Sequence, residues 1–139
     1  MNYVRLLIAA IVASVVLIIG QIAFVLVIGS RLMAARETAG LLPFVPQPLL
    51  SLLEVFLTGA FLVWLYAVLR SRCGPGVMTA LKAGLASWFA VVGLSTLHTV
   101  TDNFGLPPSL LLTIAIIIMP VFVLATVAGA WIYQERVIP

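Results

Sequence analysis

Cysteine, histidine and charge are scarce in this 139-residue sequence, and each scarcity removes a class of function. The single cysteine, Cys73, excludes an internal disulfide and any zinc site built from several thiolates. The single histidine, His98, excludes a haem with two histidine ligands from one chain. Charged residues make up 8% of the chain, whereas about 25% is usual in a soluble domain. An ordinary soluble fold is therefore excluded.

Catalytic motifs are also missing. The sequence has no GxSxG, HExxH or CxxC motif and no glycine-rich phosphate loop. The seven basic residues give a net charge of +3 but form no basic stripe, so we expect no nucleic-acid partner. These absences argue against an enzyme, although they leave that question open.

Apolar residues are abundant, at 64% of the chain, and they gather in four long runs. The runs are 6–28, 49–69, 83–100 and 110–133. About 20 apolar residues in a helix cross the hydrocarbon core of a bilayer, and only a helix satisfies its own backbone there. The sequence therefore predicts an all-α integral membrane four-helix bundle, with one transmembrane domain over residues 1–139 and the lipid bilayer as its solvent.

The first run follows Arg5, as the apolar part of a secretory signal peptide would. It is longer than the roughly 7–15 apolar residues of such a peptide, so we interpret it as a retained span. After Glu37 the loop 31–48 becomes apolar and rich in proline. We expect this loop to lie in the membrane interface, to fold back on the bundle or to dock on a partner.

Proline and glycine divide the later runs. Gly74-Pro75-Gly76 precedes the third run, and this order predicts a type II turn. Pro107-Pro108 predicts the start of the fourth helix. Pro120 lies inside that helix and is expected to kink it.

Basic residues predict the orientation in the membrane. Four spans place both termini on one side, and that side carries Arg5, Arg70, Arg72, Lys82 and Arg136, against Arg31 and Arg36 opposite. The positive-inside rule then predicts cytoplasmic termini. Of these cations, Arg70, Arg72 and Lys82 flank the turn at 74–76, where they can hold anionic lipid headgroups.

Tryptophan and tyrosine are also expected on the cytoplasmic side. The residues are Tyr3, Trp64, Tyr66, Trp88, Trp131 and Tyr133. Aromatic belts normally mark both interfaces. The asymmetry is either chance in a small sample or a sign that another protein covers the opposite rim.

Polar residues within the runs are predicted to approach the opposite, outer leaflet. They are Gln21, Glu54, Thr58, Ser95, His98 and Asp102. His98 and Asp102 are four residues apart, which places them on one helix face. One interpretation is a polar site that passes protons or binds a metal. The alternative is that His98 and Asp102 are interfacial, Gln21 joins helices, and Glu54 snorkels or is protonated.

Cofactors are not required by this pattern. The ligands are too few to predict a metal site, and His98 alone could ligate the magnesium of a pigment or one face of a haem. Small residues recur at four-residue spacing, as in Ala9 and Ala13, Ala80 and Gly84, Ala125 and Gly129, and Thr126 and Ala130. Such pairs let helix backbones approach closely, within one chain or between chains.

The stretch from Trp64 to Trp88 includes Trp64-Leu65-Tyr66-Ala67, Arg70-Ser71-Arg72, Gly74-Pro75-Gly76 and Ala83-Gly84-Leu85. It resembles a stretch found in small four-span bacterial membrane proteins of unassigned function. The resemblance implies a multi-pass protein of the bacterial inner membrane and supplies no activity or site.

Three functions fit the sequence, in decreasing order. The first is a non-catalytic structural or interaction subunit of a homo-oligomer or of a larger membrane complex, for example a photosynthetic or respiratory one. The second is a small oligomeric transporter or channel that uses Glu54 as its coupling carboxylate. The third is a cofactor-binding membrane protein that uses His98.

Overall fold

The computed structural model describes residues 3–41, 47–102 and 105–133. Within these ranges every regular element is helical, and four helices are long and apolar enough to cross a membrane. They are α1 (Tyr3–Thr38), α2 (Pro48–Cys73), a composite span (Val77–Thr101) and α5 (Pro108–Ile132). The composite span consists of α3 (Val77–Trp88), the π-helical segment η1 (Phe89–Gly93) and α4 (Leu94–Thr101). The prediction of an all-helical, multi-span chain is confirmed.

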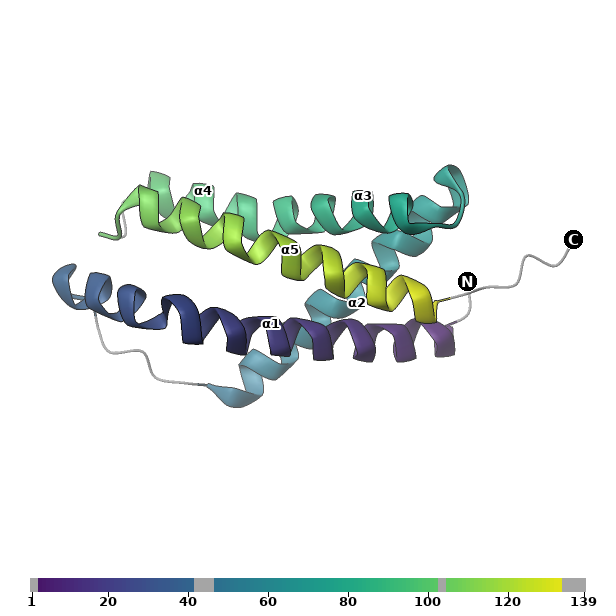
Figure 1. Cartoon of the computed structure of the whole chain (residues 1–139), viewed down its shortest axis with the longest axis horizontal. Coiled ribbons are helices and arrows are strands. Elements are labelled where there is room, and N and C mark those ends of the chain that lie inside the picture. The colour runs from purple at the N-terminus through teal and green to yellow at the C-terminus, as the bar shows by residue number, and fades with distance from the viewer. Residues whose placement is uncertain (1–2, 42–46, 103–104, 134–139) are drawn as a thin grey trace, which may run out of the picture.

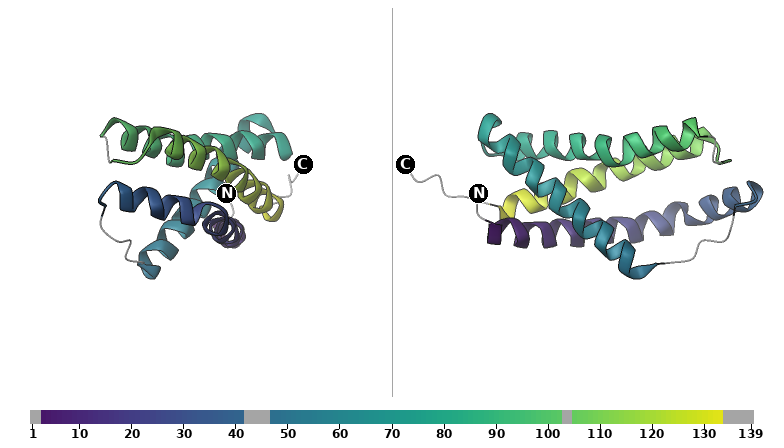
Figure 2. Two further views of the ribbon diagram at one scale, coloured as in Figure 1. Left: turned by 60° about the vertical axis from the view of Figure 1, so that its left-hand side comes forward. Right: turned by 180° about the vertical axis from the view of Figure 1, so that it is seen from behind.

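The spans cross one another at an angle. α1 packs against α2 and α5, and α5 packs in turn against α3. α2 runs obliquely past the other helices, from the start of α3 at one end to beyond α1 at the other (Figures 1 and 2). α1 and α5 lie close together where α1 begins and α5 ends, and they separate toward the opposite end (Figure 1).

Burial divides the bundle into two parts. The first part, which we call the closed half, contains nearly all of the buried residues. They lie at 9–17 in α1, at 55–66 in α2, at 79–87 in α3 and, for the most part, at 122–130 in α5. In the second, the open half, η1 and α4 bury no residue, and α1 buries only Ile28 beyond Leu17. The tightly packed core thus occupies only one end of the helices.

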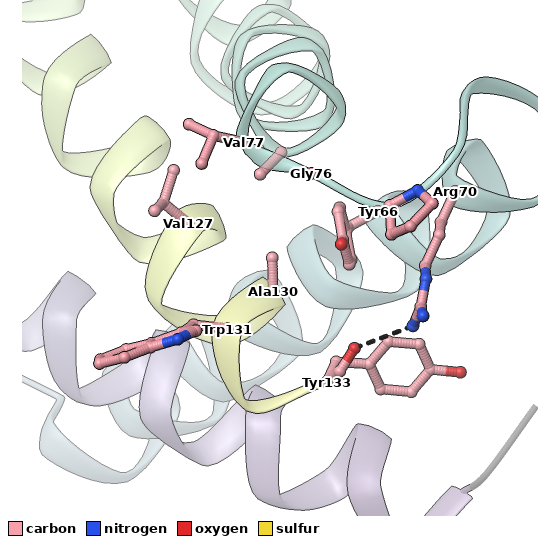
Figure 3. A pocket seen from close by; sticks show the side chains of 10 residues that line it. Tyr66, Arg70, Gly76, Val77, Val127, Ala130, Trp131 and Tyr133 are labelled. Atoms are coloured by element: carbon pink, nitrogen blue, oxygen red, sulfur yellow. Dashed lines mark hydrogen bonds between the residues drawn. The ribbon is translucent and has the colours of Figure 1, made fainter. Parts of the chain in front are cut away.

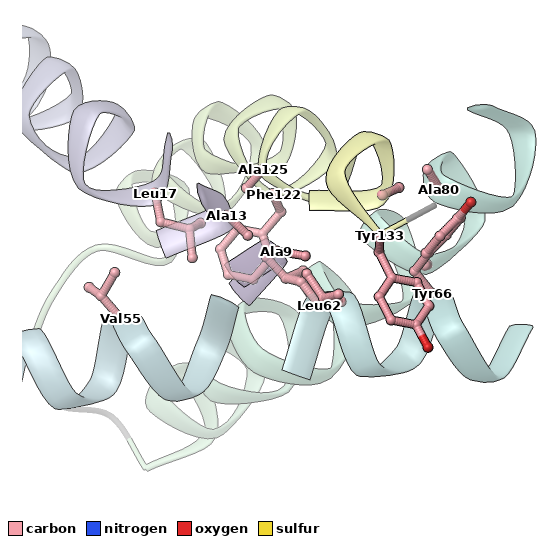
Figure 4. Packing of buried hydrophobic residues seen from close by; sticks show 13 residues of the cluster. Ala9, Ala13, Leu17, Val55, Leu62, Tyr66, Ala80, Phe122, Ala125 and Tyr133 are labelled. Atoms are coloured by element: carbon pink, nitrogen blue, oxygen red, sulfur yellow. The ribbon is translucent and has the colours of Figure 1, made fainter. Parts of the chain in front are cut away.

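Small side chains fill much of the closed half. Every member of the four small-residue pairs found in the sequence is buried, and Ala9, Ala13 and Ala125 are fully so. Figure 4 shows these alanines in one cluster with the larger side chains of Leu62 and Phe122. The predicted close packing is therefore confirmed, and these faces are used within the chain.

Glycines mark the points of closest approach. A Cβ added at Gly59 would lie 2.9 Å from the carbonyl oxygen of Ala10 on α1. At the same crossing, the Ser14 hydroxyl donates to the carbonyl oxygen of Ala10 at 2.8 Å and to that of Val55 at 3.4 Å. Because lipid provides little hydrophobic driving force between helices, contacts of this kind hold the spans together.

Two predicted loops differ from the structure. α1 continues to Thr38, so the first part of the predicted loop at 31–48 is helical, and the apolar part at 42–46 lies outside the described residues. The prediction of a type II turn at 74–76 is also wrong. Gly76 has φ 148° and ψ 172°, whereas the third residue of that turn needs φ near +80° and ψ near 0°.

Proline does fix two helix starts. α2 begins at Pro48 and α5 at Pro108, because a missing N–H costs nothing at the first helical position. α5 also continues through Pro120, and the kink expected there stays a prediction.

Replacing Gly84 by alanine should destabilise the α3–α5 crossing. The new Cβ would stand 2.9 Å from the Cα of Val123, a backbone atom that cannot move without shifting α5. We expect the free energy of unfolding to fall by about 1–3 kcal/mol, measured by equilibrium unfolding in detergent micelles.

Gly29→Ala is the matched control, because its Cβ would meet only the side chain of Val25, at 3.3 Å, and no backbone atom of another helix. Its effect should stay within about 0.5 kcal/mol. Equal losses in the two variants would contradict the assignment of the close crossing to Gly84.

Candidate functional site

A cavity of about 380 Å³ lies where all four spans face one another, at the border of the closed and open halves. Its lining includes most of the polar residues predicted to gather, together with one that was not predicted. These are Gln21 from α1, Glu54 and Thr58 from α2, and Ser95 and Thr96 from α4.

The cavity is lined mainly by apolar side chains, with the five polar residues among them. Leu17, Val55 and Phe122 belong to the buried core and close the cavity on the side of the closed half. On the other side, α2 and α4 diverge (Figure 2), and the exposed side chains of Glu54 and Ser95 lie on these two helices. The cavity is thus open, and its carboxylate is near the opening.

His98 and Asp102 do not join this group. His98 Nε2 lies 3.2 Å from Asp102 Oδ2, which confirms that the two share a helix face. Their side chains are 72% and 45% exposed, however, and neither residue lines the cavity. An exposed pair of this kind contributes about 0–1 kcal/mol to stability.

The π-helical segment explains this separation. In a continuous α-helix eleven residues make about three turns, so His98 would lie on the face of Ser87, which is fully buried. η1 interposes a turn in which the Leu94 N–H donates to the carbonyl of Phe89, five residues back. One extra residue rotates everything after it by about 100°. His98 therefore turns outward, while Val92 and Thr96 turn toward the cavity.

Trp88, immediately before η1, has a structural contact that the sequence did not reveal. Its indole Nε1 donates to the carbonyl oxygen of Ala115 on α5 at 2.8 Å. The next carbonyl along α5 is that of Ile116. It has no helical donor, because that donor would be the backbone N–H of residue 120, which proline lacks. Trp88 therefore binds α3 to the turn that proline disturbs, inside the span, and does not mark the rim as its place in the aromatic pattern suggested.

The predicted headgroup residues divide into two kinds. Arg72 and Lys82 are exposed. Arg70 is partly buried instead, and its Nη1 donates to the carbonyl oxygen of Tyr133 at 3.1 Å.

The cavity combines a mainly apolar lining with a few polar groups. Among the described residues, no group of three or more His, Cys, Asp and Glu side chains is placed to hold a metal ion. The lining offers one carboxyl, one amide and three hydroxyl groups, and it contains no thiol or imidazole. Such groups can hydrogen-bond a polar partner or accept a proton at Glu54.

Comparisons with known proteins add no function to this geometry. No family model, curated protein or solved structure matches the chain. The interpretation therefore depends on the cavity and on the residues around it.

Replacing Trp88 by phenylalanine should remove the hydrogen bond to Ala115 and keep most of the ring. We expect the free energy of unfolding in micelles to fall by about 1 kcal/mol, because a hydrogen bond between two helices inside the span is lost. Trp131→Phe makes the same chemical change at a side chain that is 76% exposed, and it should have little effect. An unchanged stability in Trp88→Phe would count against this role.

Proposed function

We propose that this protein is a non-catalytic subunit of a membrane assembly, and that a second copy of the chain covers the open half. The observation that carries this proposal is the exposure of Gln21 and Glu54 within membrane-spanning helices. A polar side chain facing lipid is costly, by about 2.5–3.5 kcal/mol for a charge at the centre of a span. A neighbouring chain with its own donors and acceptors removes that cost.

A second copy suits this surface because the two side chains are complementary. Gln21 carries amide donors, and Glu54 carries carboxyl acceptors. Both line the same cavity, from the adjacent helices α1 and α2. In a two-fold dimer each contact occurs twice, so Gln21 of each copy can face Glu54 of the other.

The closed half offers no comparable surface for assembly. Its small-residue pairs, which would otherwise let another helix approach, are buried inside the chain. Assembly through the open half therefore leaves the existing core intact. A larger membrane complex, for example a photosynthetic or respiratory one, belongs to the same proposal as a wider assembly.

A small oligomeric transporter is the second candidate, and the cavity favours it. Glu54 stands at the opening of a space that is lined by hydroxyl groups and shared by all four spans. In this role Glu54 would bind and release a proton or cation, and the dimer would enclose the pathway.

We also propose that both termini lie in the cytoplasm of a bacterial cell, with the spans in its inner membrane. α1 begins and α5 ends at the same end of the bundle (Figure 1), where Arg5, Arg70 and Arg72 also lie. The positive-inside rule supports this orientation. A reporter that is active only in the cytoplasm should be active when fused to either end of the chain. A reporter that is active only in the periplasm should be inactive at both ends, and its activity there would contradict the proposed orientation.

Replacing Glu54 by leucine should weaken self-association. Each interhelical hydrogen bond is worth about 1 kcal/mol, and the two-fold dimer loses two of them, so we expect roughly a thirtyfold rise in the dimer dissociation constant. Subunit counting in lipid nanodiscs over a range of protein-to-lipid ratios would measure it. Glu37→Leu, at an exposed carboxylate near the end of α1, is the control and should leave the dimer unchanged.

Two results would contradict the proposed assembly. The first is a wild-type chain that stays monomeric at every ratio. The second is proton or cation flux in reconstituted vesicles that Glu54→Gln abolishes while the dimer persists, because this result would favour the transporter.

A further inference from the structure

A second cavity, of about 580 Å³, lies at the opposite end of the bundle, and we call it the basic cleft. It is bounded by the end of α2, the turn at 74–76, the start of α3 and the end of α5 (Figure 3). This position is independent of the open half and of the assembly proposed there.

The polar side of the basic cleft consists of hydrogen-bond donors. Arg70 extends along it and holds the carbonyl oxygen of Tyr133 (Figure 3). A guanidinium has five N–H donors in a rigid fork, so it can hold a carbonyl and a phosphate oxygen together. None of the described residues that line the cleft is acidic.

Tyr66 gives an independent indication of a ligand. Its side chain lines the cleft although the residue is only 4% exposed, and its ring packs edge-on against that of Tyr133, with centroids 6.5 Å apart. Among the described residues, its hydroxyl has no hydrogen-bond partner. Within the ranges that the structure describes, Ser87 Oγ is the only fully buried side-chain polar atom without a partner, so the Tyr66 hydroxyl is the accessible end of its side chain. It can donate to an acceptor bound in the cleft.

The start of α3 adds partial positive charge. Gly76 and Val77 line the cleft, and the first turn of α3 has neither a side-chain cap nor an acidic residue. The exposed N–H groups of a helix start favour an anion, and phosphate is a common one.

The opposite side of the cleft is apolar and lies near the membrane surface. Val77, Val127 and Ala130 form it, and the rim carries Trp131, which is 76% exposed. A tryptophan at the end of a span usually lies at headgroup level. An anion that enters here with an apolar remainder would place that remainder along α3 and α5.

We infer that the basic cleft binds the phosphate of an anionic phospholipid, through Arg70, the Tyr66 hydroxyl and the start of α3. The apolar wall then contacts the glycerol and the upper part of the acyl chains. This assignment differs from general attraction between lipid and cations, because it depends on a neutral hydroxyl inside the fold.

Tyr66→Phe is the decisive variant, since it removes only the hydroxyl and that group supports no contact in the fold. Full-length chain in neutral phosphatidylcholine nanodiscs would be titrated with phosphatidylglycerol, and bound lipid counted by native mass spectrometry. We expect Tyr66→Phe to weaken binding about tenfold, as loss of one hydrogen bond to a charged group predicts.

Controls separate the cleft from its alternatives. Tyr3→Phe and Arg31→Gln alter an exposed tyrosine near the start of α1 and an exposed cation near its end, and both should bind as wild type does. Arg70→Lys keeps the positive charge but loses the planar, forked arrangement of N–H donors in the guanidinium. Lipid binding should therefore weaken, while the helical circular dichroism signal stays unchanged. Inorganic phosphate at millimolar concentration should not displace the lipid.

Several outcomes would overturn the inference. One is equal binding of phosphatidylglycerol and phosphatidylcholine, and another is wild-type binding in Tyr66→Phe. Displacement by inorganic phosphate would show that the lipid is not the ligand.

Discussion

The close approach of helix backbones at small residues is the contact on which the rest of this structure depends. In water, burial of large apolar side chains would hold the helices together, but lipid solvates such side chains as well as a protein core does. The core here is accordingly rich in alanine, with glycines at the crossings of α1 with α2 and of α3 with α5. Many leucines and isoleucines lie on the outside instead.

Concentrating this packing at one end has a consequence for the polar residues. A backbone crossing leaves no room for a carboxyl or amide group, so Gln21 and Glu54 lie where the helices have already separated. Both cavities occur where the packing ends, one beside the core at the level of η1 and the other beside the turn at 74–76. The two candidate sites therefore result from the same arrangement that gives the core its density.

Much of the architecture could be predicted from the sequence because lipid permits few solutions. Runs of apolar residues predict the spans, and Pro48 and Pro108 locate two helix starts. The end of α1 could not be predicted, because the polar residues after Arg31 are compatible with either a helix or a loop. The turn type at 74–76 was predicted wrongly, because glycine can adopt many backbone conformations and the one that a type II turn needs is only one of them.

The candidate site was predictable only in part, and η1 is the reason. Gln21, Glu54, Thr58 and Ser95 come together as the sequence suggested, because regular helices preserve the spacing on which that prediction relied. Nothing in Phe89–Gly93 announces a π-helical turn, since each residue there is compatible with an ordinary helix. The resulting rotation brings Thr96 to the cavity and removes His98 from it, so one local irregularity decides which side chains belong to the site.

The length of α1 has a further consequence. Its 36 residues extend for about 54 Å at a rise of 1.5 Å each, whereas the hydrocarbon core measures about 30 Å. The core fixes the first turns of α1 near Ala9, and the excess length lies at the other end, from Arg31 to Thr38. If α1 crosses a bilayer without tilting, these last turns extend beyond the hydrocarbon. These turns carry Arg31 and Arg36, so both arginines of this end of the chain lie on the part of α1 that exceeds the hydrocarbon thickness.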